Sequence, residues 1–188
     1  MSWSFLKNKK IIIGMWLLVA LLAAIKQFLI GKFNNYLIFK HVFFHTLEQK
    51  SLYGLYPELY FDRNHYGPIF SLFIAPFAVL PDAIGMPLWA IFNAAILIYA
   101  ITKIPVDAHK VNLILWICFH EFLTAILGFQ FNPIMTAIII LSFVYINEEK
   151  DLWAAFCIAL GTFIKLYGVV GLAFFFFSKN KPKFIISL

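Results

Sequence analysis

Four ionisable side chains that could support acid–base chemistry lie close together in the first half of the chain: Glu58, Asp62, Arg63 and His65. They come just before a Tyr-Gly-Pro sequence at 66–68. A carboxylate can act as a general base toward a hydroxyl, and an arginine can bind a phosphate through two parallel hydrogen bonds. The cluster is therefore a candidate site for general-base chemistry or for phosphate binding. The same composition is also typical of an ordinary solvated loop.

A second candidate is Lys165, a single cation within the apolar sequence GTFIKLYG. An ionisable residue at membrane depth costs roughly 2.5–3.5 kcal/mol on insertion, and it marks a functional site by default. The flanking glycines are typical of the broken helices from which membrane proteins build sites for charged substrates. The alternative is a lysine at a helix end whose ammonium reaches the membrane interface.

The turn GFQFNP at 128–133 carries two uncharged hydrogen-bonding side chains, Gln130 and Asn132. Amides of this kind suit a hydroxyl-rich ligand, although Gly and Pro also punctuate ordinary loops. His120 and Glu121 lie inside the apolar run before this turn. They either face a neighbouring helix as one polar pair or line the same cavity.

The sequence predicts no metal site and no cofactor. His41 and His45 are four residues apart and share a helix face, but no third ligand accompanies them, so we interpret them as interfacial histidines. Cys118 and Cys157 each lie within an apolar run and are interpreted as small buried hydrophobic residues.

The elements that must position these side chains are membrane helices. Of the 188 residues, 63% are hydrophobic and 13% are charged, whereas about 25% are charged in a typical soluble domain. Too few polar residues remain to cover the apolar surface in water. The net charge of +6 comes from lysines that lie mostly between apolar runs. This distribution favours contact with the headgroups of a lipid bilayer and argues against nucleic acid as a partner.

We therefore expect an all-α, polytopic membrane helix bundle that forms one domain over 1–188, with about six membrane-embedded segments. The first span, 11–30, is too long for a cleaved leader and reads as a retained signal anchor. Residues 31–66 form an outer loop with an interfacial helix, because Tyr36, Phe39, Phe43 and Leu47 recur at helical spacing. The later segments are a short re-entrant segment at 67–80, spans at 84–102, 111–129 and 133–147, and a hairpin or long span at 152–177.

The distribution of basic residues predicts which way the bundle faces in the membrane. We first assume that 67–80 does not cross the membrane and that 152–177 is a hairpin that turns near Lys165. The side with the N-terminus then carries nine lysines, at 7, 9, 10, 103, 110, 150, 179, 181 and 183, against five basic residues, at 32, 40, 50, 63 and 165. The positive-inside rule places the N-terminus in the cytoplasm of a multi-pass protein of the cell (inner) membrane. If 67–80 and 152–177 are both single spans, the termini stay inside but 128–133 moves to the cytoplasm.

Taken in order, these motifs resemble glycosyltransferase family 87, the polyprenyl-phosphate-mannose-dependent alpha-mannosyltransferases of the GT-C membrane superfamily. The family pattern has an outer loop with an acid just before a Tyr, a Tyr-then-Pro entry to a short apolar segment ending in Leu-Pro, a Gly-Gln-x-Asn-like turn, and a later Lys. The matching stretches, over most of 31–178, are Asn34-Asn35-Tyr36, Tyr53 with Tyr56, Tyr66-Gly67-Pro68, Ala75-Pro76 through Leu80-Pro81, Gly128-Phe129-Gln130-Phe131-Asn132, and Lys165.

Two departures from the family pattern affect the chemistry. Asn35 replaces the loop acid, and Phe129 separates the Gly from the Gln of the turn. An amide cannot take a proton from an acceptor hydroxyl, so either Glu58 or Asp62 does this or the chain is inactive. The resemblance also predicts that the chain is truncated, because the second half of the family pattern would follow Leu188.

The resemblance implies that a hexose, mannose in the family, moves from a polyprenyl-phosphate sugar to a hydroxyl of a glycan or glycolipid acceptor on the extracytoplasmic face. A carboxylate deprotonates the hydroxyl, the sugar inverts, and cations stabilise the departing lipid phosphate. The expected catalytic residues are Asp62 or Glu58, with Asn35 at the position of the family acid. The expected substrate-binding residues are Arg63, His65, Tyr66, Gln130, Asn132 and Lys165.

Two other functions are open on the sequence alone. Polar residues inside spans, such as Lys165 and Glu121, and broken helices are also typical of a transporter or channel, although no inverted repeat is visible. Asn35 in place of the family acid favours a catalytically inactive membrane partner of another protein.

Overall fold

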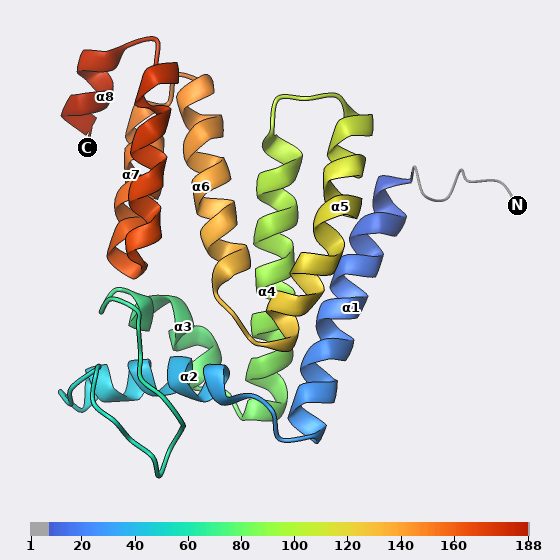
Figure 1. Ribbon diagram of the computed structural model, residues 1–188, viewed down its shortest axis with the longest axis vertical. Coiled ribbons are helices and arrows are strands. Elements are labelled where there is room, and N and C mark those ends of the chain that lie inside the picture. Colours follow the sequence, from blue (N-terminus) through green and yellow to red (C-terminus); the bar gives the residue numbers. More distant parts are fainter. Residues whose placement is uncertain (1–7, 188) are drawn as a thin grey trace, which may run out of the picture.

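Helices are the only regular secondary structure in the described part of the chain, as the sequence predicts. In the computed structural model, which describes residues 8–187, the long helices run side by side and the short helices α2 and α3 cross one end of them (Figure 1). The helices are α1 (Lys9–Leu29), α2 (Asn34–Leu47), α3 (Phe70–Ala78), α4 (Asp82–Lys103), α5 (Ala108–Leu127), α6 (Asn132–Asn147), α7 (Asp151–Ile164), the 3₁₀ helix η2 (Leu166–Phe177) and α8 (Lys181–Ser187).

Within residues 8–187, three helices are long and apolar enough to cross a membrane, namely α1, α4 and α5. At 1.5 Å per residue, a helix of about 20 residues matches the hydrocarbon thickness of a bilayer. These helices indicate a multi-pass membrane protein. The helices α6, α7 and η2 are also apolar but shorter, so six membrane-embedded segments remain a prediction.

The helix bounds lie within a few residues of the segments expected from hydropathy. The outer loop contains α2, whose side chains Tyr36, Phe39 and Val42 are buried, while Leu47 at its end is 65% exposed. The predicted short segment at 67–80 contains α3, which has Pro76 inside it. The C-terminal helix α8 was not expected as an element.

Helix α4 lies at the centre of the bundle and packs against α1 on one side and α6 on the other. Small side chains make the α1 contact close, because Ala20, Ala23 and Ala24 of α1 are buried, as is Ala90 of α4. Aromatic rings fill the space where the crossing helices meet the bundle. Trp89 of α4 lies with its ring centroid 6.1 Å from that of Phe39 and 6.2 Å from that of Phe131.

Two polar contacts fix α2 across the end of the bundle. The Lys40 ammonium forms an ion pair with Asp82 in the first turn of α4, with an N–O distance of 2.6 Å. The Tyr36 hydroxyl donates a hydrogen bond of 3.1 Å to the Phe77 carbonyl of α3. Because this end also carries the α5–α6 turn and the end of α7, the outer loop and the helix turns lie together (Figure 1).

The segment predicted at 152–177 folds as two packed helical rods, α7 and η2, joined at Lys165. A 3₁₀ helix has three residues per turn, so Gly168 and Gly171 share one face, and both are buried. A Cβ at Gly168 would lie 2.1 Å from the Thr162 nitrogen, and one at Gly171 would lie 2.7 Å from Ile158 Cγ1. The missing side chains therefore allow the two rods of the hairpin to approach.

Gly168→Ala tests this contact. The added methyl meets backbone atoms of α7, so we expect a destabilisation of about 1–3 kcal/mol, seen as a lower thermal-unfolding temperature in detergent. The matched control is Gly14→Ala in α1, where a Cβ has no neighbour within 4 Å. That change should be neutral or raise stability by up to about 1 kcal/mol. Equal effects of the two substitutions would contradict the packing described here.

Candidate functional site

A cavity of about 450 Å³ lies where the outer loop meets the turn of the α7–η2 hairpin. We call it the loop–hairpin cavity. Its lining residues come from α2, from the loop and from the turn: Asn35, Ile38, Phe39, Asp62, Arg63, His65, Tyr66, Lys165, Leu166 and Tyr167. The structure thus brings together six of the residues that the sequence marks as site candidates.

Lys165 lies between α7 and η2, and its backbone is extended. This extended residue ends α7 and separates it from η2. Its ammonium is 5.3 Å from the ring centroid of Tyr66 and 4.7 Å from that of Tyr167. Cation–π contacts of this kind hold a cation without neutralising its charge. Among the residues the structure describes, no carboxylate lies within 4 Å of this ammonium, so it can bind an anion.

The loop is held against the hairpin at Gly67. Its N–H donates a hydrogen bond of 2.8 Å to the carbonyl of Ile164, the last residue of α7. A Cβ at Gly67 would lie 1.9 Å from the Phe163 carbonyl oxygen, so only glycine fits. Tyr66 stacks on Phe70 with ring centroids 4.8 Å apart, and burial raises the pKa of its phenol to about 12. The hydroxyl therefore stays protonated at neutral pH.

Side-chain amides shape the loop that carries Asp62 and Arg63. The Asn34 amide makes two hydrogen bonds to the backbone of Phe61, 2.8 Å to its carbonyl and 2.7 Å from its N–H. Buried Asn64 bonds the backbone of Tyr66 in the same way, at 2.9 and 3.0 Å. Asp62 between them has a φ of 76°, a conformation that is strained for a residue with a side chain.

Asn35 lies between two cavities. Its Nδ2 donates a hydrogen bond of 2.7 Å to the Gly128 carbonyl in the α5–α6 turn, which fixes its amide. Besides the loop–hairpin cavity, it lines a cavity of about 570 Å³ that also contains Glu58 and Lys32. The two candidate bases are thus separated: Asp62 lies with Lys165, and Glu58 lies in the neighbouring cavity.

The family model of glycosyltransferase family 87 matches residues 64–188, which is more than half of the chain. The chain belongs to glycosyltransferase family 87. Family membership supports a transferase enzyme of the GT-C type. The matched range includes Tyr66, the α5–α6 turn and Lys165. No curated protein and no solved structure matches the chain.

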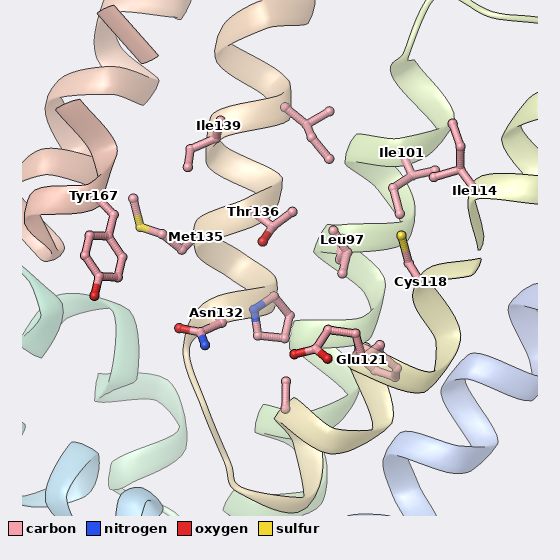
Figure 2. Close-up of a pocket in the computed structure, with 14 residues that line it drawn as sticks. Leu97, Ile101, Ile114, Cys118, Glu121, Asn132, Met135, Thr136, Ile139 and Tyr167 are labelled. Carbon is pink, nitrogen blue, oxygen red and sulfur yellow. The ribbon is translucent and has the colours of Figure 1, made fainter. Parts of the chain in front are cut away.

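Two residues expected to bind sugar in this glycosyltransferase, Gln130 and Asn132, do not line the loop–hairpin cavity. Asn132 Nδ2 donates a hydrogen bond of 2.8 Å to Gln130 Oε1. Asn132 lines a third cavity, of about 430 Å³, between α4, α5 and α6 (Figure 2). Tyr167 lines both this cavity and the loop–hairpin cavity. Contact of either amide with a sugar therefore stays a prediction.

The residues that sequence reasoning missed are the loop amides, above all Asn64. It lies in the run Asp-Arg-Asn-His just before Tyr66, where an Asn can form a hydrogen-bonded turn with the backbone two residues on. This local preference of Asn for turns was the signal in the sequence that could have identified Asn64. Within the described residues, no group of three or more His, Cys, Asp or Glu could hold a metal, and His41 and His45 lie with Tyr60 instead.

Because of His45, we expect the stability of the folded chain to depend on pH. Its side chain is buried, its ring centroid is 4.0 Å from that of Tyr56, and neither nitrogen has a hydrogen-bond partner among the residues described. Burial lowers the pKa of His45 below its ordinary value of 6.5, and nearby Lys50 acts in the same direction. The unfolded chain therefore takes up a proton more readily than the folded one as the pH falls below about 6.5.

We expect the thermal-unfolding temperature in detergent to fall between pH 7.5 and pH 5. The difference should shrink in His45→Phe, which keeps a ring against Tyr56 but cannot be protonated. His109→Phe, which replaces an exposed histidine at the start of α5, is the matched control and should leave the difference unchanged. An unchanged pH dependence in His45→Phe would contradict this assignment.

Proposed function

We propose that this glycosyltransferase moves a hexose, mannose by its resemblance, from a polyprenyl-phosphate sugar to a hydroxyl of a glycan or glycolipid. The observation that carries the proposal is the grouping of Arg63, Lys165 and Asp62 around one cavity, although the two cations come from distant parts of the chain. Two cations can bind the lipid phosphate, and the carboxylate beside them can take a proton from the acceptor.

The proposed reaction needs no metal. Asp62 removes the proton from the acceptor hydroxyl, and that oxygen forms a bond to the anomeric carbon of the sugar. The bond from this carbon to the phosphate oxygen breaks, and the polyprenyl phosphate leaves with the electron pair. Arg63 and Lys165 stabilise the charge that develops on the phosphate, which is the electrostatic part of the catalysis. Attack opposite the leaving group inverts the sugar.

Glu58 is the second candidate base, and Asn35 lies between the two. The fixed amide of Asn35 can accept a hydrogen bond from a hydroxyl through its oxygen but cannot remove the proton. We therefore assign Asn35 to holding the acceptor. Asp62 is favoured over Glu58 because it lines the same cavity as both cations. His65 and Tyr66 line that cavity as well and would contact the donor.

We propose that the site faces the extracytoplasmic side of the cell membrane, with the N-terminus in the cytoplasm and α6, α7 and η2 embedded with the three long helices. The α4–α5 connection and α8 lie at the same end of the bundle as the start of α1 (Figure 1). Eight of the nine lysines of the predicted cytoplasmic side belong to that end, and Lys7 lies outside the described residues. The bias toward nine basic residues against five supports this orientation.

The test is sugar transfer in liposomes that contain the full chain, radiolabelled polyprenyl-phosphate mannose and a glycolipid acceptor. Lys165→Ala should lower kcat/KM by about 10²–10³-fold, because the phosphate loses a fixed cation. Asp62→Asn should lower it by about 10²–10⁴-fold, while Glu58→Gln has little effect. Lys110→Ala, at the other end of the bundle, is the matched control.

Three results would contradict the proposal. The first is an absence of transfer by the unaltered chain. The second is equal activity of Lys165→Ala and Lys110→Ala. The third is a loss on Glu58→Gln without one on Asp62→Asn, which would move the base to the neighbouring cavity.

A further inference from the structure

The cavity between α4, α5 and α6 is a groove that neither the fold nor the proposed reaction explains. Helices α5 and α6 both pack on α4, which forms the floor through Leu97 and Ile101 (Figure 2). The walls are mostly apolar, with Ile114 and Cys118 from α5 and Ile139 from α6. We call this cavity the α5–α6 groove.

The carboxylate and the amide of the groove lie at one end, and the hydroxyl of Thr136 lies about one helical turn further in. Glu121 of α5 and Asn132 of α6 lie near the α5–α6 turn, while Ile114 and Ile139 lie about two helical turns further into the bundle (Figure 2). The groove therefore has one hydrogen-bonding end, at the level of the loop–hairpin cavity, and an apolar length beyond it. This is the layout of a lipid with one polar headgroup.

The charge of Glu121 determines which kind of lipid headgroup can bind in the groove. It lies within a helix long enough to span a membrane, where a carboxylate is costly unless it is matched. Within residues 8–187, no basic side chain lies within 4 Å of it. A carboxylate repels a phosphate and accepts hydrogen bonds from hydroxyls. The groove thus favours an uncharged, hydroxyl-bearing headgroup.

The α5–α6 groove and the loop–hairpin cavity have opposite electrostatic characters and share Tyr167 as a wall. The cavity has two cations, Arg63 and Lys165, beside the carboxylate of Asp62, whereas the groove has the carboxylate of Glu121 and no lysine or arginine in its lining. A donor with a phosphate headgroup and an acceptor with hydroxyls would then be directed by charge to two different cavities that share Tyr167.

We propose that the α5–α6 groove binds the acceptor of the reaction as a neutral glycolipid. Its sugar hydroxyls hydrogen-bond to Glu121 and Asn132, and its apolar chain lies along Ile101, Ile114 and Ile139. The assignment of this lipid as the acceptor rests on the proposed function, but its binding in the groove does not.

The test uses the full chain in liposomes with two photoreactive lipids that carry the same diazirine acyl chain. One is an uncharged monohexosyl diacylglycerol and the other is phosphatidic acid. After irradiation, mass spectrometry should find the glycolipid on peptides from α5 and α6, with about tenfold more labelling than phosphatidic acid, as expected for hydrogen bonds to a charged group. A photoreactive polyprenyl phosphate should not label these peptides.

Two variants test the groove itself. Cys118→Phe fills it and should remove most of the labelling, whereas Ile117→Phe, one residue away on a side chain that is 69% exposed and lies outside the groove, should not. Because a phenylalanine could disturb folding, Glu121→Lys provides an independent test. It keeps the groove open and should reverse the preference toward phosphatidic acid.

Equal labelling by the two lipids, or labelling that Cys118→Phe and Glu121→Lys leave unchanged, would overturn the inference. Labelling by the polyprenyl phosphate would assign the groove to the donor, and a cross-link to a second copy of the chain would assign it to an interface. Groove labelling without any sugar transfer would leave lipid binding in the groove standing, and it would remove the proposed function together with the assignment of this lipid as the acceptor. Transfer without groove labelling would do the reverse.

Discussion

The backbone hydrogen bond from Gly67 to Ile164 is the contact on which the candidate site depends. It joins two parts of the chain that are far apart in sequence, the outer loop and the turn of the α7–η2 hairpin. Because a Cβ at Gly67 would overlap the Phe163 carbonyl, the approach is possible only at a glycine. Without this contact Arg63 and Lys165 would not line one cavity, and the proposed phosphate site would lose one of its two cations.

Irregular backbone at the edge of a membrane protein needs hydrogen-bond partners, and here side-chain amides supply them. Gln27 donates to the Leu127 carbonyl and Asn35 to the Gly128 carbonyl, so α1 and α2 both hold the α5–α6 turn. Asn34 holds the loop at Phe61. Side-chain amides thus contribute to the structure at this end of the bundle, and Asn35, a site candidate from the sequence, combines this with a place between two cavities.

The helices could be predicted from the sequence because apolar runs of known length determine them, and Lys165 could be placed at a turn because glycines flank it. The grouping of Asp62, Arg63 and Lys165 was an expectation from the family resemblance, and the three side chains line one cavity, while their roles stay a prediction. The amide clamps at Asn34 and Asn64 could not be predicted, since each depends on which backbone segment lies opposite. The same holds for Asn132, which faces the α5–α6 groove because α6 begins there, and for the 3₁₀ winding of η2, which depends on contact with α7.

The most direct test of the account is whether the loop and the hairpin turn face the same side of the membrane. Single cysteines at 62, 165 and 107, in a chain with Cys118 and Cys157 replaced by alanine, can be labelled in sealed, right-side-out vesicles with a membrane-impermeant maleimide. We expect labelling at 62 and 165 from outside, and at 107 only after the vesicles are opened. Labelling of 62 and 165 from opposite sides would contradict the site described here.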